Sequence, residues 1–148
     1  KVLIQGRDAI QIPENEKRSL YGYVEQTFHR VPGTVKDQIT LYDDSFTMEE
    51  VREAATIAGL DATIEQLEKG YDTICTSEIF SQGQWQLLSI ARAAVAKPKL
   101  LLLDEITANL DAQTEEEVLQ ALKRAAEGRT VISISHRVNA ETGRIIDI

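Results

Sequence analysis

Four consecutive leucines occupy positions 100–103, and two carboxylates, Asp104 and Glu105, follow them directly. The run is far shorter than the ~20 apolar residues that span a bilayer. It also lacks polar alternation, which is typical of a strand buried on both faces of a parallel sheet. Helical patterns flank it, one ending at Lys97 and Pro98 and the other at Gly128. Helices that alternate with buried strands predict an α/β fold with a mostly parallel sheet and helices on its faces.

Polar residues mark where helices of this fold begin. A Ser or Thr followed three residues later by Glu or Gln forms a capping box, in which each side chain satisfies a backbone N–H of the other residue. We identify three such pairs: Thr47 with Glu50, Ser81 with Gln84, and Thr114 with Glu117. We also expect short helices over residues 34–40 and 62–69, and strands over residues 2–4, 9–12, 21–24, 130–134 and 145–148.

The composition excludes several classes of protein. The 148 residues include 16 Lys and Arg against 24 Asp and Glu, a net charge of −8. A nucleic-acid backbone is repelled by that average, so we expect no nucleic-acid partner. The single cysteine, Cys75, rules out an internal disulfide framework and fits a reducing compartment. With two histidines beside it, a zinc site of Cys and His is not expected.

The two carboxylates after the leucines are candidates for chemistry. A buried parallel strand delivers Asp104 and Glu105 to its carboxyl end, where open α/β sheets bind ligands. Successive side chains of a strand point to opposite faces. One carboxylate can therefore hold a hydrated Mg²⁺ while the other acts as a base toward water. The alternative is that both charges only cap the strand where it meets solvent.

Further candidates lie at the boundaries of the expected elements. Residues 81–84 open a long helix, and a helix N-terminus attracts phosphate through its unpaired N–H groups. Gly83 would let a ligand approach the backbone closely. Asp111 stands before the next helix, His136 follows one expected strand, and Gln26 follows another. Taken singly, each is more typical of an ordinary helix cap or polar loop residue than of a functional residue.

Taken together and in order, these segments resemble the nucleotide-binding domain of ATP-binding cassette (ABC) transporters. Residues 80–112 are similar to the family's signature motif, Walker B strand, catalytic glutamate and D-loop at the expected spacing. Residues 23–26 resemble the Q-loop, residues 33–39 the segment that follows it in exporter-type cassettes, and residues 130–137 a strand with the H-loop histidine. The resemblance covers nearly the whole chain.

This resemblance implies a P-loop NTPase-like α/β fold with a mostly parallel sheet, flanking helices and an added helical subdomain. It assigns residues 34–96 to the helical subdomain that carries the signature. Residues 1–33 and 97–148 would be parts of the catalytic core.

The resemblance also implies a role for each candidate residue. Asp104 and Gln26 would hold Mg²⁺, Glu105 would polarise the water that attacks the γ-phosphate of ATP, and His136 would hydrogen-bond that phosphate. The signature and D-loop residues would bind the ATP held by the opposite subunit: Ser81, Gln82, Gly83, Gln84 and Asp111. The active unit would be a head-to-tail dimer of nucleotide-binding domains. It would be attached to transmembrane domains on the cytoplasmic side of a membrane and would power transport.

The chain departs from the family pattern at several points. Gln82 stands where the signature usually has glycine, and Ala108 stands where the D-loop commonly has serine. Segments 73–80 and 137–143 are shorter than usual. None of the glycines is followed by lysine, so the P-loop motif G-x-x-x-x-G-K-S/T is absent. We therefore expect the C-terminal part of a cassette, cut after its P-loop helix, which is inactive alone although its intact parent is an ATPase.

Three alternatives remain open. The first is a soluble ABC-type ATPase of DNA repair, chromosome maintenance or translation, against which the exporter-like residues 33–39 and the acidic balance argue. The second is a binding or regulatory module without catalysis, which the missing P-loop favours and which should not respond to ATP. The third is a degenerate cassette that only binds ATP, against which the presence of Glu105 and His136 argues.

Overall fold

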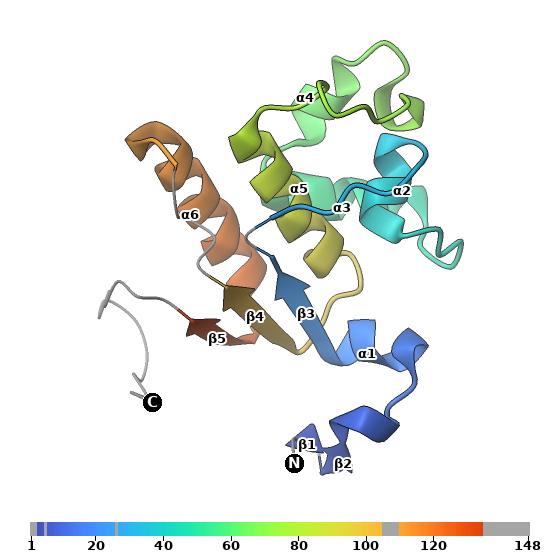
Figure 1. The fold of residues 1–148 in the computed structure, drawn as a ribbon, viewed down its shortest axis with the longest axis vertical. Coiled ribbons are helices and arrows are strands. Elements are labelled where there is room, and N and C mark those ends of the chain that lie inside the picture. The colour runs from blue at the N-terminus through green and yellow to red at the C-terminus, as the bar shows by residue number, and fades with distance from the viewer. Residues whose placement is uncertain (1–2, 5, 26, 105–109, 135–148) are drawn as a thin grey trace.

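A computed structural model describes residues 3–4, 6–25, 27–104 and 110–134 (Figure 1). In this part of the chain a parallel sheet lies beside a group of helices, and a short N-terminal hairpin lies apart from both (Figure 1). The expected α/β architecture with a parallel sheet is confirmed. The strand expected over residues 145–148 lies outside the described residues.

The sheet consists of β3 (Tyr21–Val24), β4 (Leu100–Asp104) and β5 (Thr130–Ile134), in the order β3-β4-β5. Both pairs of neighbours run parallel, with Val24 opposite Leu103 and Leu103 opposite Ser133. The leucine-rich strand is therefore the central one. Because all three strands run the same way, their carboxyl ends meet at one edge of the sheet.

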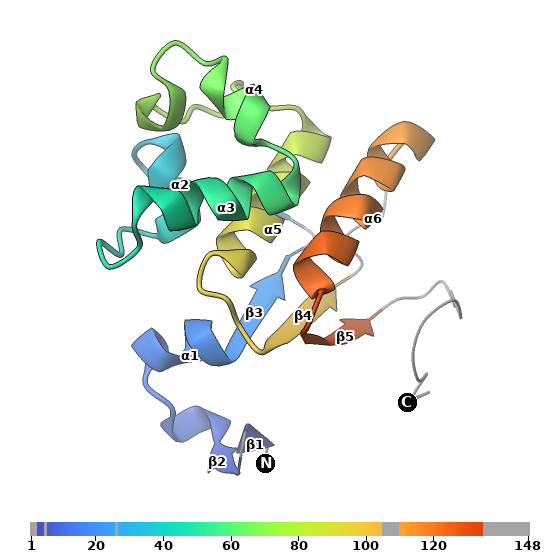
Figure 2. The same cartoon turned by 180° about the vertical axis from the view of Figure 1, so that it is seen from behind.

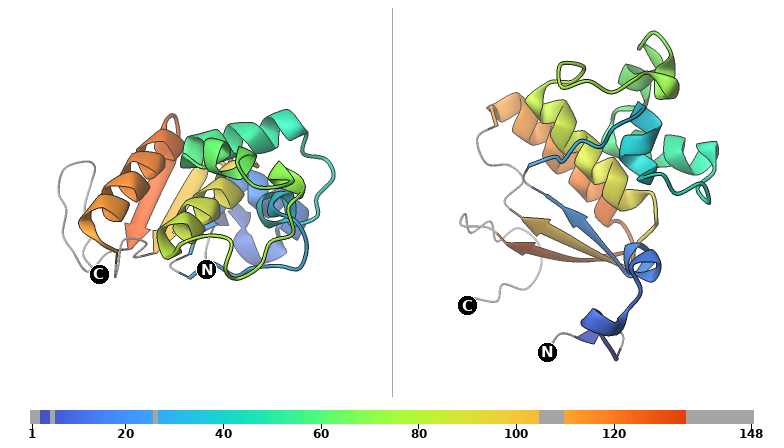
Figure 3. Two further views of the ribbon diagram at one scale, coloured as in Figure 1. Left: turned by 90° about the horizontal axis from the view of Figure 1, so that it is seen from above. Right: turned by 45° about the vertical axis from the view of Figure 1, so that its right-hand side comes forward.

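Among the described residues, helices cover only one face of this sheet (Figure 3). On that face Val24 is buried and Leu101 is 1% exposed, and a Cβ at Gly22 would lie 3.0 Å from the carbonyl oxygen of Ala93. On the opposite face Tyr23 is 45% and Ile132 is 52% exposed. The expectation that all four leucines are buried is thus wrong for three of them, which are half-buried. Leu100 and Leu102 are half-buried because alternate side chains of β4 point to the uncovered face, whereas Leu103 shares the covered face with Leu101 and packs against the core only in part.

The helical group comprises α2 (Val35–Thr40), α3 (Met48–Ala58) and α4 (Asp61–Glu65), which lie with the long helix α5 (Gln82–Ala94). Helix α3 also packs on α6 (Ala112–Ala126), which runs beside α5 (Figure 2). Helix α5 contacts α2, α3, α6 and β3, so it joins the helical group to the sheet. The largest fully buried apolar side chains follow this arrangement: Val24, Val35, Ile39, Val51, Leu60, Ile64, Leu88, Ile90, Val95, Leu101 and Val118.

Two of the three expected capping boxes are confirmed, at Thr47 with Glu50 and at Ser81 with Gln84. The third is wrong. Helix α6 begins one turn earlier, with Asp111 as its N-cap, because the Asp111 carboxylate accepts the backbone N–H of Thr114 at 2.8 Å. Thr114 is thus the third residue of the first turn, and Asp111 is the stronger capping residue type.

The N-terminal segment differs most from the expectation. Strands β1 (Leu3–Ile4) and β2 (Arg7–Asp8) form a hairpin, and residues expected as a strand form the 3-10 turn Ala9–Gln11. Helix α1 (Glu14–Leu20) was not expected, because its polar sequence has no apolar periodicity. The helix expected over residues 62–69 is shorter and is followed by the 3-10 turn Gly70–Asp72.

Candidate functional site

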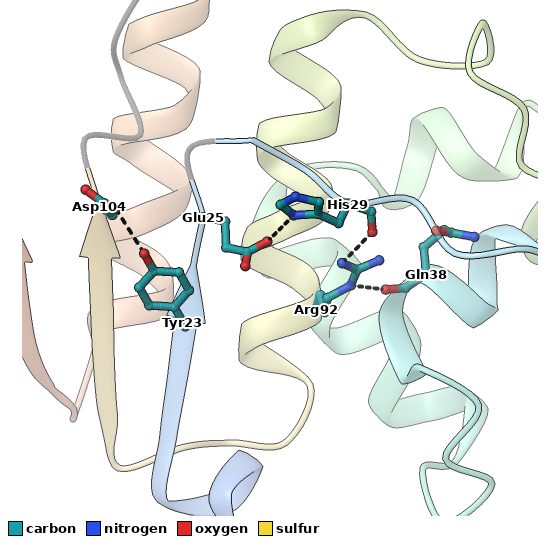
Figure 4. Close-up of polar contacts among 6 residues, drawn as sticks. All are labelled: Tyr23, Glu25, His29, Gln38, Arg92 and Asp104. Atoms are coloured by element: carbon teal, nitrogen blue, oxygen red, sulfur yellow. Dashed lines mark hydrogen bonds and ion pairs between the residues drawn. The ribbon is translucent and has the colours of Figure 1, made fainter. Parts of the chain in front are cut away.

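Asp104 is the last residue of the central strand, at the carboxyl edge of the sheet. The hydroxyl of Tyr23, from the neighbouring strand β3, donates a hydrogen bond of 3.0 Å to Asp104 Oδ2 (Figure 4). This hydrogen bond is the main cause that raises the pKa of Tyr23 above its ordinary value. A carboxylate offers about four lone-pair sites. Asp104 therefore keeps acceptor capacity for a cation while Tyr23 restrains its orientation.

Three other predicted site residues, Gln26, Glu105 and His136, lie outside the described residues. Their roles stay predictions. The described chain reaches Glu25 just after β3, Asp104 at the end of β4 and Ile134 at the end of β5.

Ser81 and Gln84 satisfy one another's backbone at the start of α5. Ser81 Oγ accepts the N–H of Gln84 at 3.2 Å, and Gln84 Oε1 accepts the N–H of Ser81 at 2.9 Å. Ser81 and Gln82 are exposed. The capping half of the prediction is confirmed, and contact with a nucleotide stays a prediction.

Gly83 is buried against the first turn of α6. A Cβ at this position would lie 2.2 Å from Thr114 Cγ2, closer than any real contact. In this structure the missing side chain therefore lets two helix N-termini approach each other. This packing brings the start of α5 next to the start of α6, which Asp111 caps.

Asp111 is exposed and accepts two hydrogen bonds from Thr114, one from the backbone N–H and one from the hydroxyl, both at 2.8 Å. The backbone N–H is the larger cause that holds the pKa of Asp111 below its ordinary value. Asp111 is thus a charged cap at the N-terminus of α6, where a negative charge is favourable.

We predict that Gly83→Ala destabilises the chain by about 1–3 kcal/mol, because the added methyl group overpacks the contact with Thr114. Thr114→Ser removes the clashing Cγ2 and leaves Thr114 Cβ at 3.5 Å as the nearest atom. The double variant should regain about 0.5–3 kcal/mol relative to the sum of the single changes. Urea unfolding of the four proteins measures this coupling, and strict additivity would contradict direct packing of Gly83 on Thr114.

The residues of this edge fit Mg²⁺ on chemical grounds. Mg²⁺ prefers oxygen ligands and usually keeps several waters, with one or two carboxylates and substrate phosphates completing its shell. Asp104 supplies one such carboxylate. The structure groups no three His, Cys, Asp or Glu side chains that could hold a metal without a substrate, in the part of the chain it describes. Over the same residues, no helix is long and apolar enough to cross a bilayer.

Two residues at this site were missed from the sequence. Tyr23 lies in the segment that resembles the Q-loop but was given no role there, and its contact with Asp104 depends on the pairing of β3 with β4. Arg92 of α5 was also missed, although it binds the segment that follows Gln26 (Figure 4). The alternation of side chains along a strand could have shown that Tyr23 and Val24 point to opposite faces of the sheet. It could not have predicted the register of β3 against β4, which brings Tyr23 next to Asp104.

Comparison with known proteins identifies the family. The model of the family described as ABC transporter matches residues 1–108, so the chain belongs to the ABC transporter family. It is 43% identical over 141 residues to the uncharacterized ABC transporter ATP-binding protein YfiC of Bacillus subtilis (strain 168), covering 94% of this chain and 23% of that protein. It is 39% identical over 142 residues to the toxin RTX-III translocation ATP-binding protein of Actinobacillus pleuropneumoniae, covering 94% of this chain and 20% of that protein.

A solved structure agrees with this result. A bacterial Atm1-family ABC exporter with ATP bound matches with a TM-score of 0.73 and 35% identity, over 91% of this chain and 24% of that one. The P-loop NTPase-like fold expected from the sequence is thereby supported. The chain spans about a quarter or less of these proteins, 20% to 24% of their length.

Proposed function

We propose that this chain is part of an ATP-binding and ATP-hydrolysing domain that powers transport by an exporter-type ABC transporter. The observation that carries the proposal is the position of Asp104. It ends the central parallel strand, where α/β sheets bind ligands, in a chain whose residues 1–108 match the ABC transporter family. The relatives named as ATP-binding proteins and the exporter structure with ATP bound support the nucleotide and the direction of transport.

The proposed chemistry divides among the residues at the sheet edge. Mg²⁺ bound to the phosphates would neutralise charge that develops during phosphoryl transfer. Asp104 would hold this ion together with Gln26, while Tyr23 restrains the Asp104 carboxylate. Glu105 accepts a proton from the attacking water, and His136 donates a hydrogen bond to the γ-phosphate.

A P-loop is required for this chemistry, and the 148 residues contain no such motif. We propose that the P-loop comes from residues outside these 148, in a longer protein. The exposed start of α5 then faces a nucleotide held by a second nucleotide-binding domain, in a head-to-tail dimer. Transmembrane domains would hold this dimer at the cytoplasmic side of a membrane. The P-loop-containing form is a protein in which a P-loop segment precedes residue 1.

A matched pair of variants separates a signature residue from an ordinary helix cap. Ser81→Ala and Thr47→Ala each remove a capping hydroxyl, at 3.2 Å from Gln84 N and 3.1 Å from Glu50 N. Each should lower the free energy of unfolding by about 0.5–2 kcal/mol. Only Ser81→Ala should also slow ATP hydrolysis by the P-loop-containing form, because only Ser81 is proposed to contact the γ-phosphate.

The measurement is the steady-state rate of phosphate release, taken at a temperature where both variants remain folded. Equal rates for the two variants would identify Ser81 as a cap alone and remove the signature from the proposed site.

A further inference from the structure

Two side chains on one face of α5 enclose an aromatic ring from the segment that follows Gln26. Trp85 and Arg92 are seven residues apart, which places them on the same side of the helix. The ring of Phe28 stacks on Trp85, with centroids 5.3 Å apart and planes inclined by 26°. The Arg92 guanidinium carbon lies 4.1 Å from the centroid of the same ring. The Phe28 ring therefore contacts two side chains of the same helix face, Trp85 near the start of α5 and Arg92 near its end.

Arg92 also binds the backbone at two points of this segment. Its Nε donates to the carbonyl oxygen of Gln38 at 2.6 Å, and its Nη1 donates to the carbonyl oxygen of His29 at 3.0 Å (Figure 4). Burial lowers the pKa of Arg92 to about 10, so the guanidinium stays charged at neutral pH. These are charge-assisted bonds in a half-buried setting, which are stronger than bonds between neutral groups.

Gln38, which is fully buried, connects separate parts of this segment by hydrogen bonds. The Gln38 amide accepts the N–H of Val31 at 2.9 Å and donates to the carbonyl oxygens of Val31 at 2.8 Å and Thr34 at 3.1 Å. Residues 28–34 are thus a folded loop that is tied to the first turn of α2. Arg92 binds the loop at His29 and α2 at Gln38.

We propose that Phe28, Trp85 and Arg92 form a clamp that makes residues 27–38 and helix α5 move as one body, with Arg92 as the positioning residue. Gln26 immediately precedes the clamped segment, and Ser81 begins the clamping helix. This inference rests on the proposed function. The clamp links Gln26, the residue expected near Mg²⁺, to residues 81–84, which are expected to contact the nucleotide of the opposite subunit. A displacement at one of them would then be carried to the other.

The planar fork of Arg92 is what the clamp requires, because lysine can neither donate two fixed bonds nor stack on a ring in the same way. We expect Arg92→Lys to accelerate amide exchange across residues 27–38 by about tenfold or more. The matched control is Arg129→Lys, since Arg129 likewise donates to two carbonyls, those of Pro98 at 2.8 Å and Ala125 at 2.6 Å. The control should leave exchange in residues 27–38 unchanged.

Hydrogen exchange of the full chain, read by mass spectrometry without nucleotide, makes this test. A local acceleration confined to residues 27–38 supports the clamp. Unchanged exchange in residues 27–38 would overturn the clamp. Equal acceleration in the central strand β4 would also overturn it, because an arginine that only stabilises the fold would loosen the whole chain. No nucleotide is present, so this failure would leave the proposed ATPase function untouched.

A second variant covers the case in which Arg92→Lys does not fold. Trp85 is the only tryptophan of the chain, so its fluorescence reports on the surroundings of this one ring, which packs on Phe28 and edge-on against Phe80. Phe28→Leu should shift Trp85 emission to longer wavelength and increase quenching by iodide. Phe46→Leu is the control, because Phe46 lies against a different arginine, Arg18. Identical Trp85 emission and quenching in both variants would overturn the clamp.

Discussion

Glu105→Gln in the P-loop-containing form is expected to retain ATP binding and to lower hydrolysis by about 10²–10⁴-fold, the usual contribution of a general base. The amide keeps the shape of the side chain and cannot take a proton from water. Because binding survives while turnover stops, a dimer loaded with ATP should accumulate. Phosphate release, ATP retention on a filter and size-exclusion chromatography measure the three effects.

The control for this change is Glu117→Gln, which makes the same carboxylate-to-amide replacement at an exposed glutamate of helix α6. It should leave both ATP binding and hydrolysis unchanged. Hydrolysis by Glu105→Gln at the unmodified rate would show that another group is the base.

The second large effect concerns the chain of 148 residues by itself. We expect no ATP hydrolysis from it and no ATP binding at micromolar concentration, because backbone N–H groups and the lysine of a P-loop provide most of the grip on phosphate. The P-loop-containing form should bind ATP in that range. Calorimetric titration of both proteins with ATP and Mg²⁺ makes the comparison, and micromolar binding by the chain alone would contradict the prediction.

The sequence predicted best those features that depend on neighbouring residues. The capping boxes at Thr47 and Ser81 are local hydrogen bonds between residues three apart, and both are present. The central strand at positions 100–104 was also predictable, because a short apolar run in front of carboxylates is typical of a strand that ends at the edge of a sheet. Helix α1 was missed since its polar sequence forms no apolar face.

Features that depend on packing between distant segments could not be predicted. The contact of Tyr23 with Asp104 requires the register of two strands and joins residues 81 positions apart. The close approach of Thr114 to the Cα of Gly83 was not foreseen either, and the interpretation of Gly83 as a point where a ligand approaches the backbone stays a prediction. The two hydrogen bonds from Arg92 to backbone carbonyls likewise join residues 54 and 63 positions apart. Sequence spacing alone carries no information about such contacts.

The central claim is that residues 81–84 act on a nucleotide held by the opposite subunit. Mixed dimers of the P-loop-containing form test it, one subunit carrying Ser81→Ala and the other lacking its P-loop lysine. If the signature acts across the dimer, both lesions fall on one composite site and the other site stays intact. Such dimers should then retain about half of the normal ATPase rate where the two sites act independently. If the signature served its own chain, each site would carry one lesion and the rate would fall to that of the damaged sites, which would contradict the account.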